Sequence, residues 1–124
     1  MSNTNTTITA GQVAPAVVNL GSTSPFSVNA SAGNDFRITL TGSATINVPS
    51  NGVDGQRITL QITQPSGSTG AKVTWGAGYN FGSTNGTPNP APTLSTGGSG
   101  VDVIGFIYNQ LVGDWFCVGA ALGF

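Results

Sequence analysis

The stretch GQRITLQITQPSGSTGAKVTW, residues 55–75, decides the fold class. Ile58, Leu60 and Ile62 alternate with polar residues in its first half, which is the period of two expected of a strand with one face on a core and the other in water. Val73 and Trp75 resume the alternation after a segment rich in Pro, Gly and Ser, where the chain can reverse. The stretch therefore predicts two strands joined as a hairpin.

The preceding stretch, DFRITLTGSATINVPS at residues 35–50, shows the same pattern. Apolar residues alternate with polar ones up to Leu40, Gly42 interrupts the run, and Ile46 and Val48 resume it. Two alternating runs joined by a short loop are typical of a hairpin, so we expect a second hairpin over residues 36–48. Beyond this similar strand spacing, the sequence indicates no internal repeat.

Two runs in the last third, VDVIGFIY at 101–108 and DWFCVGAA at 114–121, are apolar on both faces. Strands of this kind lie in the interior of a sheet or against another subunit. Asn109 and Gly113 predict the turn between the two runs. The apolar residues that follow, Leu122 and Phe124, are expected to be tucked into the domain.

Residues 1–35 are sparse in large apolar side chains, so this segment could hardly fold alone. We expect a polar N-terminal arm with one or two short strands, around 16–20 and 26–29, ahead of a domain at 36–124. An arm that buries so little of its own surface becomes ordered by docking on the domain or on a neighbouring chain. Its expected contacts with a neighbouring molecule are the apolar residues Ile8, Val13, Val17 and Val18.

Charge is unusually scarce, because the 124 residues include three Lys or Arg and four Asp, with no Glu and no His. A nearly neutral surface lacks the clustered cations that attract phosphates or anionic lipids, so nucleic acid and membranes are poor candidates for partners. The first residues, MSNTNTTIT, contain neither the basic start nor the apolar run of a signal peptide. We therefore expect a soluble protein made in the cytoplasm.

Scarce charge also bears on sheet edges, which soluble β-proteins usually protect with charged residues. The edges must be covered by barrel closure, by loops or by neighbouring copies in an oligomer, and we favour neighbouring copies. No window of the sequence shows the apolar spacing of a helix. We therefore expect an all-β fold, a single β-sandwich or barrel-like domain of antiparallel strands with an extended N-terminal arm.

Catalytic chemistry has few residues to use in this chain. Asp35 and Asp54 could in principle form a carboxylate pair of the glycosidase kind, but Asp residues at turns usually make local hydrogen bonds. Cys117 is the only cysteine; with no His to activate it, we expect it to be a small buried apolar residue. The sequence lacks ligands for zinc, the loop spacing of a calcium site and a phosphate-binding loop before a helix. We therefore expect a protein that is not an enzyme and that needs no metal or cofactor.

Tyr79 and Phe81 are the aromatic residues best placed for recognition, because they lie in the Gly-rich segment that follows Trp75. Exposed rings there could stack on a sugar or fill a pocket on a partner protein. The alternative, which we favour, is that they pin the long loop to the domain. Trp75 and Trp115 lie on predicted strands and are expected to pack in the core or at an interface.

Five segments in this order, RITLQITQ, KVTW, PTLS at 92–95, VDVIGFIYN and DWFCVG, resemble a pattern found in small β-structured virion proteins of tailed bacteriophages. These proteins include head decoration and head-fibre proteins and the distal domains of tail fibres. The resemblance covers residues 55–124. It implies a β-sandwich or barrel-like domain, usually trimeric, that builds or decorates the particle without catalysing a reaction.

A chain of this size with a short polar arm suits a capsid decoration, or cement, protein on the outer head surface of the virion. Such a protein would bind the major capsid protein as a homotrimer and stabilise the junctions between capsid subunits. The alternative is recognition of a host receptor or surface glycan by a fibre or spike tip, through Tyr79, Phe81 and the loop 84–100. The expected subunit interface lies on the two doubly apolar strands, at Ile104, Phe106, Tyr108, Trp115 and Phe116.

Overall fold

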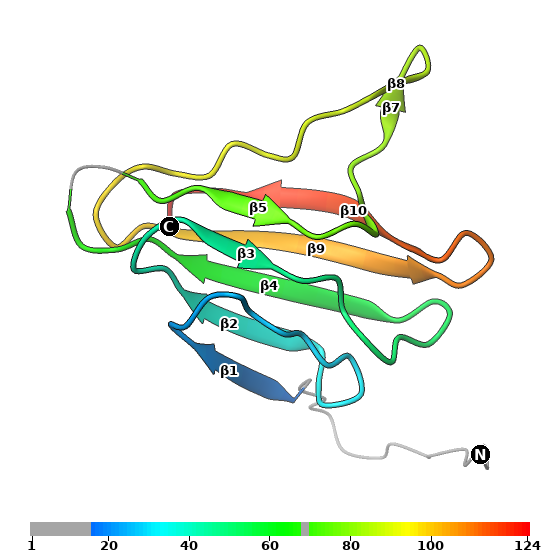
Figure 1. The fold of residues 1–124 in the computed structure, drawn as a ribbon, viewed down its shortest axis with the longest axis horizontal. Helices are drawn as coiled ribbons and strands as arrows, with labels where there is room; N and C mark the ends of the chain where they lie inside the picture. The colour runs from blue at the N-terminus through cyan, green and yellow to red at the C-terminus, as the bar shows by residue number, and fades with distance from the viewer. Residues whose placement is uncertain (1–15, 68–69) are drawn as a thin grey trace, which may run out of the picture.

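The computed structural model describes residues 16–67 and 70–124, and this part of the chain is all-β, without a helix. The strands form a six-stranded sheet in the order β1-β2-β4-β9-β10-β6 and two two-stranded sheets, β3-β5 and β7-β8 (Figure 1). The strand bounds are β1 Val17–Gly21, β2 Asp35–Thr39, β3 Ala44–Ile46, β4 Arg57–Thr63, β5 Val73–Trp75, β6 Tyr79–Asn80, β7 Ser83–Thr84, β8 Thr87–Pro88, β9 Val101–Asn109 and β10 Asp114–Ala121.

The pairing of the first strands differs from the two hairpins that the sequence predicts. β2 pairs in parallel with β1 and with β4, whereas β3 pairs in parallel with β5 in a separate sheet. The predicted hairpins over 36–48 and 55–75 are therefore wrong, and so is a purely antiparallel fold. The turns that follow β2 and β4 carry the chain across to another layer, and do not return it along the same sheet.

The hairpin predicted in the last third is confirmed. β10 pairs antiparallel with β9, from Asp114 opposite Asn109 to Ala121 opposite Val103, with a bulge between Cys117 and Gly119. β9 also pairs antiparallel with the whole of β4, from Arg57 opposite Ile107 to Thr63 opposite Val101. The hairpin thus joins the parallel strands β1, β2 and β4 to the short strand β6, which runs parallel to β10.

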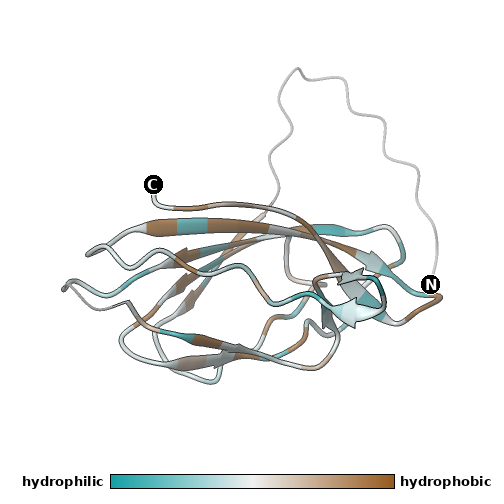
Figure 2. Cartoon of the chain, turned by 90° about the horizontal axis from the view of Figure 1, so that it is seen from above, coloured by the Kyte–Doolittle hydropathy of each residue, from teal (hydrophilic) through white to brown (hydrophobic). Residues whose placement is uncertain are grey.

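A second layer lies across the six-stranded sheet. Phe26 and Asn29 form parallel bridges to Ile46 and Ser50, so the segment around residues 26–29 runs beside β3, and β3 runs beside β5. The strands accordingly lie at two levels in Figure 2. One apolar core fills the space between the levels, with fully buried side chains from both, including Phe26, Ile46, Phe36, Ile38, Leu60, Ile62, Ile104 and Phe106.

The described part of the predicted N-terminal arm belongs to the body of the domain. β1 confirms the strand expected around 16–20, and it is the outermost strand of the main sheet. Phe26, Val28 and Ala30 are each no more than 3% exposed and form part of the core. These residues share one core with the residues that follow position 35. Ile8 and Val13 of the expected arm lie outside the described residues.

The C-terminal end is attached through its backbone, and its apolar side chains stay in solvent. Phe124 exchanges two backbone hydrogen bonds with Val101, yet its ring is 73% exposed, and Leu122 is also exposed. The expectation that these residues are tucked into the domain is wrong. The buried carboxylate of Asp102 helps to hold this end, because its two oxygens accept hydrogen bonds from the backbone N–H groups of Ser95 and Gly123.

Candidate functional site

The outer face of the six-stranded sheet, which points away from the core, is polar on β2 and β4. Residues paired in neighbouring strands share a face. Phe36, Leu60 and Ile104 point into the core. Because side chains alternate along a strand, the residues on either side of each of them point outward. On β2 and β4 these outward residues are Asp35, Arg37, Thr39, Arg57, Thr59, Gln61 and Thr63.

The same face is apolar on β9 and β10. Phe116 lies opposite Ile107, and Ala121 lies opposite Val103. Val118, the extra residue of the bulge, is 61% exposed, and it covers Gly105, where an added Cβ would lie 3.5 Å from its Cγ2. We call this surface the outer apolar strip and define it by Val101, Val103, Ile107, Phe116, Val118 and Ala121. The sequence predicts apolar residues on both faces of β9 and β10. The inner face carries the side chains that are buried in the core, and the outer apolar strip lies on the face that remains accessible.

The structure separates the five predicted interface residues into two groups. Ile104, Phe106 and Trp115 are at most 1% exposed and pack in the core of their own chain. Tyr108 is half-buried with its ring centroid 4.8 Å from that of Trp115, and Phe116 belongs to the outer apolar strip. The accessible surface for a partner therefore lies on the opposite face of β9 from the one that carries Ile104 and Phe106.

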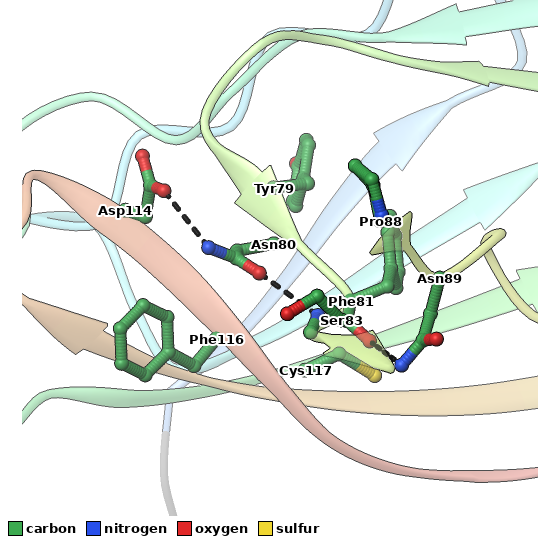
Figure 3. A pocket seen from close by; sticks show the side chains of 10 residues that line it. Tyr79, Asn80, Phe81, Ser83, Pro88, Asn89, Asp114, Phe116 and Cys117 are labelled. Atoms are coloured by element: carbon green, nitrogen blue, oxygen red, sulfur yellow. Dashed lines mark hydrogen bonds between the residues drawn. The ribbon is translucent and has the colours of Figure 1, made fainter. Parts of the chain in front are cut away.

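A groove of about 680 Å³ opens between β6, the first half of β10 and residues 81–89 (Figure 3). Its walls are fixed by hydrogen bonds. The Asn80 Nδ2 group donates to Asp114 Oδ2 at 3.1 Å, and the Asn80 Oδ1 atom accepts from the Gly82 N–H at 2.8 Å. On the other side Asn89 donates from Nδ2 to the Phe81 carbonyl. Ser83 and Asp114 also line the groove.

Tyr79 is a structural residue. Its side chain is 9% exposed, its hydroxyl donates a 2.8 Å hydrogen bond to the Asn47 carbonyl, and its ring packs edge-on against Trp75 at 5.0 Å. Burial raises the pKa of the Tyr79 hydroxyl well above its usual range. The favoured prediction that the aromatic residues pin the loop is therefore confirmed for Tyr79. Phe81 also packs on Trp75, at 5.5 Å, but it is only partly buried and lines the groove.

The residues considered for catalysis have structural partners. Asp35 forms a 3.2 Å ion pair with Arg37, and Asp54 Oδ1 accepts a hydrogen bond from the Gln110 N–H. Cys117 is half-buried and lines the groove, whereas the sequence predicts a buried residue. Within residues 16–67 and 70–124, no three His, Cys, Asp or Glu side chains gather into a group that could hold a metal ion. The same described residues include no helix of the length and apolarity needed to cross a membrane.

Sequence reasoning missed the groove because its polar residues come together only through the pairing of β6 with β10. Asn80 and Asp114 are 34 positions apart and carry no recognisable spacing. Comparisons with protein families, with curated proteins and with solved structures found no match for this chain. The outer apolar strip and the groove are the candidate functional surfaces of the described residues.

Proposed function

We propose that this protein is a non-enzymatic structural protein of a tailed-bacteriophage virion, a decoration or cement protein that binds the outer surface of the head as a homotrimer and stabilises junctions between capsid subunits. In this proposal the partner is the major capsid protein, and the two layers around one core form a β-sandwich. A protein that binds the assembled shell and not its dissociated subunits stabilises the shell by mass action.

The outer apolar strip is the observation that carries this proposal. It combines the exposed Val118 with the partly buried Phe116 and Ile107 in one surface, on the outside of a sheet whose other half is polar. Contiguous apolar surface of this kind on a soluble protein usually marks a contact with another protein. An uncharged surface on hydrogen-bonded strands suits a permanent mechanical contact.

The first test is the protein's location and copy number. A decoration protein is present in many copies on purified particles and also on heads that lack tails, so it should appear as a strong band when tailless heads are analysed on a stained gel. Tailless heads without this band would refute the proposal. Because the proposed contact is nearly uncharged, attachment should change little between low and moderate salt concentration.

The second test places a charge in the outer apolar strip. Val118→Lys should weaken attachment to heads about tenfold or more, since burying a Val side chain contributes roughly 1.5 kcal/mol. Thr39→Lys is the matched control, because Thr39 is exposed on the polar half of the same face. Equal attachment of the two variants would place the contact elsewhere.

The groove favours a second candidate function, the recognition of a host-surface glycan by a fibre or spike tip. Its preformed amide, carboxylate and hydroxyl groups next to Phe81 are groups that bind sugars, by hydrogen bonds to hydroxyls and by packing on an apolar ring face. Ser83→Tyr should fill the groove and abolish binding in a glycan array. Thr87→Tyr, on the neighbouring strand β8 but outside the groove lining, is the control.

A further inference from the structure

Within residues 16–67 and 70–124, both edges of the six-stranded sheet have a stretch with no further strand beside it. β6 pairs only with Trp115 and Phe116, so from Cys117 to Ala121 the one strand beside β10 in the described chain is β9. At the other edge β2 is the one strand among the described residues that pairs with β1. Ala120 shares the inner face with Ile104 and is nevertheless exposed, so the second layer does not cover the sheet at this edge.

Neither of these edge stretches carries the charged residues or prolines that usually prevent pairing with another chain. The sequences are VVNLG on β1 and CVGAA on β10, without a charged residue or a proline. Each edge has one bulge, and the Asn19 side chain accepts a hydrogen bond from the Gly21 N–H. Regular open backbone therefore remains at residues 17–19 and 119–121. Open N–H and C=O groups on a neutral strand form a template for another strand.

The directions of the strands indicate which strand fits. β9 runs antiparallel to β4 and to β10, so β10 points the same way as β4, β2 and β1. A β1 strand from a second copy can pair with β10 in parallel when the outer faces of the two sheets lie on the same side. This pairing would continue, along β10, the parallel pairing that β6 makes with Trp115 and Phe116. Its Val17, which is 53% exposed and shares the outer face with Asp35, would then lie next to Val118 and Ala121.

We propose that the β10 edge of one copy pairs with the β1 edge of a second copy, which joins the six-stranded sheets of successive copies and lengthens the outer apolar strip. The two edges differ, so the contact is heterologous and produces a closed ring, of which a trimer is one case, or an open chain. The inference concerns the purified protein alone and stands whether or not the proposed function is correct.

Cross-linking between the two edges tests the proposal. Val17→Cys and Ala121→Cys are combined in a Cys117→Ala background, and the purified protein is treated with a short bis-maleimide. Within one chain β2, β4 and β9 separate the two positions by roughly 19 Å, at about 4.8 Å per strand, so a link between them joins two copies. The double variant should give trimers or a longer ladder on a denaturing gel, with the 17–121 link identified by mass spectrometry. The two single-cysteine variants should stay largely unlinked.

Two outcomes would overturn the proposal. Efficient dimer formation by the Ala121→Cys variant alone would mean that β10 pairs with a second β10. Sedimentation as a monomer at tens of micromolar, with no cross-linking, would mean that the edges stay open. A charge at each edge gives an independent check: Val17→Lys and Ala121→Lys should each weaken self-association about tenfold or more, whereas Thr39→Lys, in the interior of the same outer face, should not. Circular dichroism confirms that each variant is folded.

Discussion

The hydroxyl of Tyr79 donates a 2.8 Å hydrogen bond to the backbone carbonyl of Asn47, 32 residues earlier in the chain. This bond connects β6, at one edge of the main sheet, to the residue that follows β3 in the second layer. It therefore helps to fix the distance between the two layers at the end of the domain where the groove lies.

Removing that hydroxyl should destabilise the domain by a moderate amount. Tyr79→Phe keeps the ring packed against Trp75 but removes the hydrogen bond from the buried Tyr79 side chain to the Asn47 carbonyl, so the free energy of unfolding should fall by about 1–2 kcal/mol in urea denaturation. Tyr108→Phe is the control, since the Tyr108 hydroxyl makes no hydrogen bond with the described residues. A change of the same size in both variants would contradict the role assigned to the Tyr79–Asn47 bond.

The raised pKa of Tyr79 predicts a loss of stability in alkali. The hydroxyl ionises at a pH near 10 in the unfolded chain, but burial keeps it protonated to higher pH in the folded protein. Its contribution is therefore fully present below pH 10 and is lost as the pH rises further, because the unfolded state then binds fewer protons. Between pH 9 and 11 the free energy of unfolding should fall less in Tyr79→Phe than in the wild type. Parallel curves would refute this explanation.

The buried carboxylate of Asp102 should be important for the C-terminal end. Asp102→Asn leaves only one acceptor oxygen for two backbone N–H donors, those of Ser95 and Gly123, and should cost about 1.5–3 kcal/mol. Amide hydrogen exchange should accelerate most around residues 95 and 123. Asp54→Asn is the matched control because Asp54 accepts a single backbone hydrogen bond at an exposed turn, which an amide oxygen can also accept.

Gly52 should not tolerate a side chain. An added Cβ would lie 2.6 Å from Cζ2 of Trp115 and 3.1 Å from Cδ2 of Tyr108, so Gly52→Ala should lower the free energy of unfolding by about 1–3 kcal/mol. Gly42→Ala provides the comparison, since a Cβ added at Gly42 would meet no atom within 4 Å, and it should be neutral or stabilising by less than about 1 kcal/mol. Thermal unfolding of both variants measures the difference directly.

The sequence predicts the strands of this protein better than it predicts their partners. The alternation of Ile58, Leu60 and Ile62 reports which residues face a core, and these three side chains are indeed buried. Alternation does not report which strand lies alongside, and a Gly- and Pro-rich segment permits a crossover between layers as readily as a hairpin. Only the hairpin of β9 and β10, whose strands are long and joined by a short turn, is paired as its local sequence predicts.

The candidate surfaces were predictable to different degrees. The apolar character of both faces of residues 101–108 and 114–121 pointed to the outer apolar strip, although it could not show that Ile104 and Phe106 face the core while Val103 and Ile107 face outward. The groove could not be predicted, because Asn80 and Asp114 meet only through a parallel pairing of two residues in β6 with β10.

The chain passes back and forth between the two layers, so the fold resembles a short solenoid. The chain crosses three times from the six-stranded sheet to the second layer: from β1 to the segment around residue 26, from β2 to β3, and from β4 to β5. In each layer the strands of successive turns pair in parallel. A winding of this kind can be lengthened by one turn without changing the others, because each turn contacts only its neighbours. The β9–β10 hairpin ends the winding on one side with a reversal of strand direction, whereas on the other side β1 is the outermost strand within the described residues.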